Sequence, residues 1–99
     1  MALVIDPAED EVRELRGITD WRGKRVLEVG CGDGRLTVRH VKFGVEKIIA
    51  FDPLPKSIRT ARKNLSDSYK EQIEYRVGYA EHVKQKADQF DIVVFSWVL

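Results

Sequence analysis

The 99-residue sequence predicts an open α/β fold, in which a mostly parallel sheet is covered by helices on both faces. Three observations support this prediction. Short apolar runs alternate with segments of helical periodicity, and the distance between successive runs suits right-handed crossovers. In addition, the glycine-rich segment GCGDG, residues 30–34, directly follows one of the apolar runs. A chain of this length forms one domain, taken here as residues 1–99, with a single modest core.

The first half of the chain is expected to form a helix, a strand, a second helix and a second strand. Asp6 and Pro7 can start a short amphipathic helix near the N-terminus. The apolar run at 26–29 predicts a strand, and residues from 34 or 35 to about 43 show helical periodicity. The segment VEKIIAFDP then predicts a second strand, which Pro53 ends.

The second half repeats this alternation. Apolar residues at 54, 58, 61 and 65 define one face of a helix, with Pro55 at its start. Residues 73–77 alternate as a strand does, and a short helix is expected around 82–87. The last segment, residues 91–99, predicts a fourth strand that is apolar on both faces, as is typical of a strand inside a sheet.

Composition excludes several classes of protein. The 17 Lys and Arg residues nearly balance the 16 Asp and Glu residues without long runs of one sign, so there is no clear signal for a nucleic-acid or membrane-surface partner. A single cysteine fits a reducing compartment. The N-terminus lacks the features of an export signal, and no apolar run is long enough to cross a membrane. We therefore expect a cytoplasmic protein with no membrane association.

The glycine segment indicates a ligand that approaches the backbone closely. Gly30, Gly32 and Gly34 precede a predicted helix, whose first N–H groups are available as donors. The dinucleotide pattern G-x-G-x-x-G would need a small residue where Arg35 stands. The carboxylates of Glu28 and Asp33 would repel a pyrophosphate but attract a cation. S-adenosylmethionine, which carries a sulfonium and an ammonium and no phosphate, suits this pattern; a nicotinamide-linked oxidoreductase is the remote alternative.

The stretch VLEVGCGDGRLT, residues 26–37, resembles the first motif of class I S-adenosylmethionine-dependent methyltransferases. Three further segments match that family in order and spacing, so the resemblance extends over residues 26–99. It implies a Rossmann-like methyltransferase fold with strand order 3-2-1-4. It also implies that the loop around the methionine part of the cofactor is formed by Glu28, Gly30, Cys31, Gly32 and Gly34.

Asp52 resembles the acidic residue with which the family binds the ribose. A carboxylate offers two acceptor oxygens for neighbouring hydroxyls, and this one stands where the second strand ends. Pro53 or Leu54, which follow it, are expected to pack on the adenine ring.

The third and fourth strand ends complete the expected site. In the family an acidic residue and an alanine follow the third strand, whereas this chain has Tyr79 before Ala80. We expect Glu81 to substitute for the acid and the backbone N–H of Ala80 or Glu81 to contact the adenine edge. Ser96, in the fourth matching segment, is expected near the methionine end of the cofactor and the acceptor.

Simpler explanations exist for several of these residues. The glycines can serve only to tighten a turn, and Asp52 before a proline can be a turn residue. Cys31 fits as a small residue and lacks the partner of a nucleophile. His40 and His82 are expected on the surface or on a helix face, because no second metal-ligand type lies at ligand spacing. No catalytic residue is identified.

The expected function is methyl transfer from S-adenosylmethionine to an unidentified acceptor, with S-adenosylhomocysteine as product. The alternative is a module that holds either compound without catalysing transfer. In the family's strand order, residues 91–99 would form an edge strand whose apolar side chains and backbone groups need a cover. We therefore expect the chain to be the cofactor-binding half of a longer methyltransferase, with this strand pairing with missing C-terminal strands or with a second copy.

Overall fold

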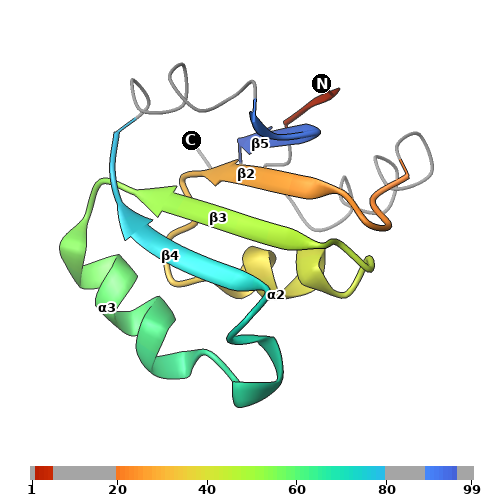
Figure 1. Ribbon diagram of the computed structural model, residues 1–99. Coiled ribbons are helices and arrows are strands. Elements are labelled where there is room, and N and C mark those ends of the chain that lie inside the picture. The colour runs from red at the N-terminus through yellow and green to blue at the C-terminus, as the bar shows by residue number, and fades with distance from the viewer. Residues whose placement is uncertain (1, 6–19, 80–88, 96–99) are drawn as a thin grey trace.

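The computed structural model describes residues 2–5, 20–79 and 89–95. In this part of the chain, parallel strands form one sheet in the order β1-β5-β2-β3-β4 (Figure 1). The predicted order 3-2-1-4 is confirmed, because the four expected strands correspond to β4-β3-β2-β5. The strands are β1 (Ala2–Ile5), β2 (Arg25–Val29), β3 (Lys47–Asp52), β4 (Ile73–Val77) and β5 (Ile92–Phe95).

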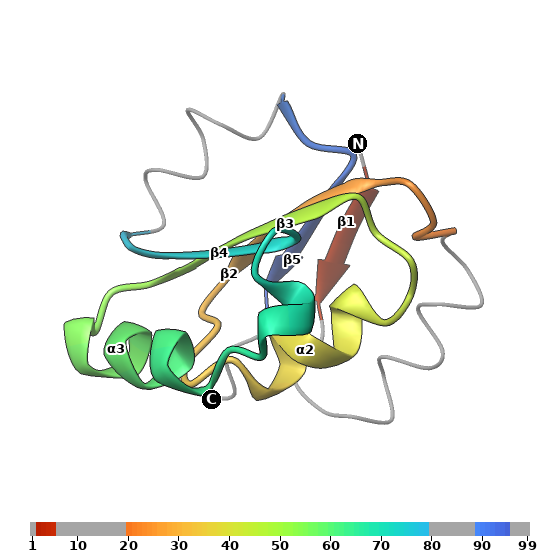
Figure 2. The same cartoon turned by 60° about the horizontal axis from the view of Figure 1, so that its bottom comes forward.

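The helices α2 (Arg35–Val41) and α3 (Pro55–Asn64) pack on the same face of the sheet (Figures 1 and 2). The chain moves in one direction from β2 through β3 to β4, so right-handed crossovers place both connecting helices on one side. A short 3₁₀ helix, η1 (Asp67–Tyr69), leads into β4. The helices predicted near the N-terminus and around 82–87 lie outside the described residues. No helix in the described ranges is long and apolar enough to cross a membrane.

The strand β1 corrects one expectation from the sequence. It pairs with β5 along its whole length, from Ala2 with Ile92 to Ile5 with Phe95, so β5 lies between β1 and β2. The prediction that the strand near 91–99 forms the edge of the sheet is therefore wrong for this structure. The four-residue run ALVI is too short to show a periodicity, and its partner is distant in sequence, so only the folded chain reveals the pairing.

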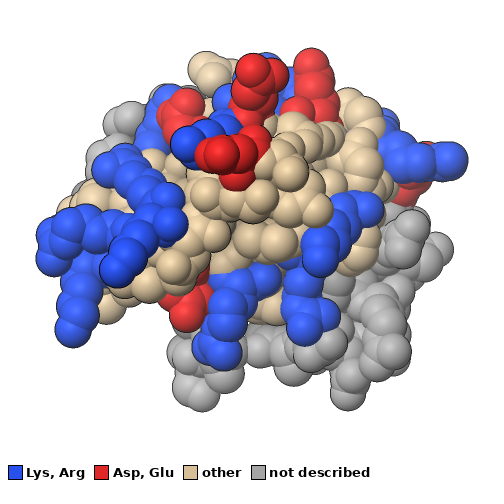
Figure 3. All heavy atoms as spheres, turned by 90° about the horizontal axis from the view of Figure 1, so that it is seen from below, with Lys and Arg blue, Asp and Glu red and all other residues tan. Residues whose placement is uncertain are grey.

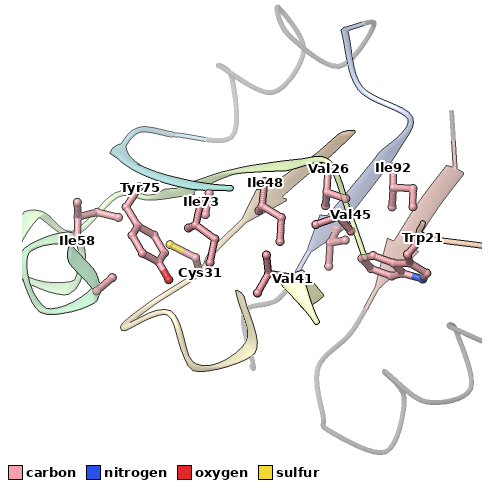
Figure 4. Close-up of a cluster of buried hydrophobic side chains, with 13 residues drawn as sticks. Trp21, Val26, Cys31, Val41, Val45, Ile48, Ile58, Ile73, Tyr75 and Ile92 are labelled. Carbon is pink, nitrogen blue, oxygen red and sulfur yellow. The ribbon is translucent and has the colours of Figure 1, made fainter. Parts of the chain in front are cut away.

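Both faces of the sheet carry buried apolar side chains, as expected for parallel strands. On the helix side, the core extends from Trp21 at one end to Ile58 on α3 at the other (Figure 4). On the opposite side, Phe51, Phe90 and Val93 belong to a second buried cluster. The core therefore fixes the relative positions of the strand ends, where the site residues were predicted.

We expect deletion of residues 2–5 to cause self-association, because it leaves the backbone N–H and C=O groups of β5 unpaired along one side. Light scattering coupled to size exclusion should show a larger mass than for the unaltered protein. Leu3→Ala, which keeps the strand backbone, serves as the control and should leave the mass unchanged. An unchanged mass for the deletion variant at high concentration would contradict this view of β1.

Candidate cofactor site

The predicted site residues that the structure describes meet at the carboxyl edge of the sheet. The glycine loop, residues 30–34, follows β2, Asp52 ends β3, and Gly78 follows β4. The ends of these three strands lie at one edge of the sheet (Figure 1). The N–H of Gly78 donates to the backbone carbonyl of Asp52 at 3.1 Å, which joins the last two of these strand ends. Open α/β sheets bind ligands at this edge. Ala80, Glu81 and Ser96 lie outside the described residues, and their roles stay predictions.

The glycine loop is folded over the end of β3. The N–H groups of Gly30 and Cys31 both donate to the carbonyl of Phe51, at 2.8 and 3.0 Å. Gly30, Gly32 and Gly34 have φ values of 81°, 56° and 89°, in the left-handed region that favours glycine. The glycines at these positions are thus required by the backbone of the loop, whatever ligand it holds.

Asp52 connects this loop to the start of α3. Its Oδ2 accepts a hydrogen bond from the N–H of Gly32 at 2.9 Å, and its Oδ1 accepts one from the N–H of Leu54, also at 2.9 Å. A carboxylate has about four acceptor sites, so it can still accept bonds from two hydroxyls. Next to it, a Cβ built on Gly32 would meet nothing within 4 Å among the described residues. The loop is therefore open on the Gly32 side, while Asp52 itself is only 8% exposed.

The position of Glu28 differs from the one predicted from the sequence. Its side chain is fully buried and accepts a hydrogen bond from Oγ1 of Thr37 at 2.9 Å, while Nδ1 of His40 lies 2.9 Å from its other oxygen. Side chains alternate along a strand, so Glu28 and Val26 face the helices. The prediction that Glu28 contacts the cofactor does not agree with this geometry, because both of its oxygens are engaged by α2.

His40 lies on a helix face, one of the two predicted places, but this face is buried. It is fully buried, its ring stacks on Trp21 with centroids 5.3 Å apart, and its partner is Glu28. The sequence contained a usable signal, because Thr37 and His40 are three residues apart and so lie on one face of a helix. A buried carboxylate in the preceding strand needs such partners.

The loop carries a negative electrostatic potential. Burial raises the pKa of the Cys31 thiol far above its usual range, and the charges of Glu28 and Asp52 raise it further. The thiol therefore stays protonated at neutral pH. The same charges favour a cation near the loop and disfavour a phosphate.

Asp33 lies on the exposed side of the loop. Its Oδ1 accepts a hydrogen bond from the backbone N–H of Arg35 at 3.2 Å, and it also lies 3.3 Å from Nε of that side chain. Both side chains are well exposed to solvent, so this ion pair is weak. The weak pair compensates little of the negative charge of Asp33, which therefore remains available to a cationic ligand.

The exposed large apolar residues of the described chain gather next to Asp52. Leu54, Val77 and Tyr79 are 61%, 45% and 56% exposed, respectively. Val77 is the register partner of Asp52, and Leu54 follows it by two positions, with exposed Pro53 between them. The sequence predicted that Pro53 or Leu54 packs on the adenine ring, but it predicted no such role for Val77 or Tyr79. Together these four residues, named here the apolar rim, are suited to one face of an aromatic ring.

Tyr75 closes the opposite side of the loop. A Cβ on Gly34 would overlap its hydroxyl group, so the two residues are in close contact. Burial raises the pKa of Tyr75 to about 12, and the charge of Glu28 contributes. Tyr75 is therefore neutral and positions the loop by contact, not by charge.

Gly34→Ala is expected to destabilise the protein by more than the about 1–2 kcal/mol of a left-handed backbone alone, because the new methyl group also meets Tyr75. Gly32→Ala is the matched control, since its φ is also positive but its surroundings are open. Denaturant unfolding should show the larger loss for Gly34→Ala. Equal losses for the two variants would contradict the contact with Tyr75.

Removal of one partner from the Glu28–His40 pair leaves a buried polar group without its main hydrogen bond. Glu28→Ala is therefore expected to lower the free energy of unfolding by about 3–5 kcal/mol. The double variant with His40→Ala should lose less than the sum of the single variants, which a double-mutant cycle measures. Exposed Glu46→Ala is the control. Additive losses would show that the pair does not couple β2 to α2.

Comparisons with known proteins identify the family of this chain. A family model described as "Methyltransferase domain" matches residues 26–99. A protein of Methanocaldococcus jannaschii named as a protein N5-glutamine methyltransferase is 30% identical over 93 residues, which cover 94% of this chain and 46% of that protein. The human mitochondrial ubiquinone biosynthesis O-methyltransferase is 39% identical over 80 residues, 78% of this chain and 21% of its own length. The chain thus spans less than half the length of these relatives.

Solved structures share the fold. An RNA methyltransferase of Salinibacter ruber in complex with S-adenosyl-L-homocysteine superposes with a TM-score of 0.72 at 20% identity, over 89% of this chain and 57% of that one. An S-adenosylmethionine-dependent methyltransferase of Listeria monocytogenes gives a TM-score of 0.69 at 21% identity, over 84% of this chain and 38% of that one. The family match begins in β2 and includes the glycine loop, Asp52 and the apolar rim. The chain therefore belongs to the methyltransferase domain family.

Proposed function

We propose that this chain provides the cofactor site of an S-adenosylmethionine-dependent methyltransferase. The observation that carries the proposal is the Asp52 carboxylate, which is held at 2.9 Å by the N–H groups of Gly32 and Leu54 beside open space. A ribose with two neighbouring hydroxyls matches an acceptor group in that place. The solved relative from Salinibacter ruber, which holds S-adenosyl-L-homocysteine, supports the choice of nucleoside.

Each part of the cofactor has a matching surface. The ribose binds Asp52, the adenine ring packs on the apolar rim, and the methionine part lies along the glycine loop, residues 30–34. Ala80 and Glu81 are proposed to contact the adenine edge, and Ser96 to border the methionine end. These assignments follow from the strand ends to which the residues belong.

The charges support a sulfonium nucleoside over a dinucleotide. Burial is the main cause of the raised pKa of the Cys31 thiol, and the carboxylates of Glu28, Asp52 and Asp33 raise it further. A pyrophosphate at the same loop would be repelled by these charges. The nicotinamide-linked alternative is therefore disfavoured.

The bound cofactor supplies a methyl group on a positively charged sulfur, which leaves as a neutral thioether and needs no acid. The chain contributes by binding and orienting, since alignment of the methyl group with the acceptor accounts for much of the rate that a protein can add. Cys31 and Tyr75 keep their protons at neutral pH, because burial raises the pKa of both groups. Neither residue therefore removes a proton from an acceptor.

The residues of this site do not identify the methyl acceptor. The relatives carry the names of methyltransferases for protein glutamine, for ubiquinone biosynthesis and for ribosomal protein L11, so relatives with similar cofactor segments use different acceptors. A module that binds the cofactor without transferring its methyl group would have the same site. Release of labelled methyl to candidate acceptors separates the enzyme from such a module.

Asp52→Ala is expected to weaken S-adenosylhomocysteine binding by about 1–3 kcal/mol, roughly 5- to 150-fold, because two charge-assisted hydrogen bonds are lost. Calorimetry measures the affinity, and thermal unfolding checks that the variant remains folded. Asp67→Ala, an exposed aspartate on η1, is the matched control. An unchanged affinity in Asp52→Ala, or NAD binding tighter than S-adenosylhomocysteine binding, would overturn the proposal.

A further inference from the structure

The outer surface of α2 and α3 is strongly basic. These two helices, with the C-cap residue of α2, carry seven Lys and Arg residues and no Asp or Glu. Figure 3, which views the molecule from below, shows several groups of Lys and Arg side chains on the side where these helices lie. This surface is named here the basic helix face, and all of its members are exposed: Arg35, Arg39, Lys42, Lys56, Arg59, Arg62 and Lys63.

The charges form a row along each helix. On α2 they stand at positions 35, 39 and 42, and on α3 at 56, 59 and 63. Residues three or four apart are neighbours on a helix surface, with Cβ atoms about 5–6 Å apart. Two rows of positive charge therefore lie on one side of a molecule whose formal net charge is only +1.

Helix stability explains only part of this distribution, because Arg39, Arg62 and Lys63 stand in the last turns of α2 and α3. Cations stabilise the C-terminal turn of a helix and destabilise the N-terminal turn, where acidic residues are favoured. Yet Arg35 and Lys56 stand in the first turns of α2 and α3, and neither first turn has an acidic residue. At these two positions the helix dipole does not favour the charge, and Arg35 pairs with exposed Asp33 at 3.3 Å.

A hollow lies between the start of α2 and the end of α3. Its volume is about 220 Å³, and its lining combines apolar Val38, Ala61, Leu65 and Tyr75 with Asn64 and the acidic Asp33. Arg35 also borders it. The surface thus offers rows of cations and, beside them, an apolar recess with hydrogen-bonding groups.

We propose that the basic helix face binds a single-stranded nucleic acid. Phosphates spaced along a strand match a row of cations, and guanidinium groups bind them through two parallel hydrogen bonds. A single strand can also place an unstacked base in the recess, which a duplex with stacked bases cannot do. The two charged rows belong to α2 and α3, whereas the recess shares Asp33 and Gly34 with the glycine loop of the proposed cofactor site. RNA binding measured without cofactor therefore tests this inference separately from the proposed function.

The same surface is poorly suited to a membrane or to an acidic protein. Interfacial helices insert an apolar face, but Ile58 and Ala61 of α3 are buried against the sheet. Protein interfaces depend on apolar anchor residues. The exposed large apolar residues of the described chain belong to the apolar rim beside Asp52, and none of them belongs to the two charged rows.

The test measures fluorescence anisotropy of a labelled single-stranded RNA of about 12 nucleotides, within the range of site sizes of single-strand binders. The full-length protein is titrated without cofactor at several salt concentrations. Lys56→Glu with Lys63→Glu removes charge from the basic helix face. Lys24→Glu with Lys70→Glu, two exposed lysines outside it, makes the same change in net charge. Thermal unfolding and S-adenosylhomocysteine affinity confirm that both variants remain intact.

We expect the first variant to bind RNA about 10-fold or more weakly and the control to change less than about 3-fold. The slope of log affinity against log salt should decrease by about 1.4 for two lost phosphate contacts. A titration with single-stranded DNA of the same sequence shows whether the surface prefers ribose or deoxyribose. Equal weakening in both variants would overturn it, as would tighter binding of duplex RNA, polyglutamate or phosphatidylserine vesicles.

Discussion

The two hydrogen bonds accepted by Asp52 are the interaction on which the arrangement of the site depends. One comes from Gly32 in the loop after β2, and the other comes from Leu54 at the start of α3. They join two segments that are 20 residues apart around one carboxylate. Because both donors are backbone groups, the carboxylate is held in place by the fold and not by flexible side chains. The group that is positioned to bind a ribose is thus also the group that positions the loop.

A second carboxylate acts through its field. Glu28 is fully buried, and its contacts with Thr37 and His40 join β2 to α2. Its negative charge nevertheless contributes to the raised pKa of the Cys31 thiol in the adjacent loop. An acidic residue upstream of the glycines can therefore favour a cationic ligand without touching it. The structure changes the role of Glu28 from ligand contact to support and electrostatics.

The molecule separates its charges in space although they nearly cancel in the sequence. Acidic groups surround the glycine loop at the carboxyl edge of the sheet, whereas the outer sides of α2 and α3 are basic. Figure 3 shows the Lys and Arg side chains in separate groups on this side of the molecule, with apolar and polar surface and some carboxylates between them. Composition alone indicated no preference for a polyanion, because a sum over the chain contains no information about which charges share a face.

The local pattern of the sequence determined the helices and strands, and also the edge of the sheet at which the site lies. Alternating apolar periods predict the strands β2 to β5 and the helices α2 and α3, and parallel strands necessarily bring the glycine loop and Asp52 to one edge. Contacts between residues distant in sequence were decided only by the tertiary structure. They include the pairing of β1 with β5, the burial of Glu28 against His40, and the apolar rim formed with Val77 and Tyr79. Periodicity shows which way a side chain faces along its own element, but which partner it meets depends on how the elements pack.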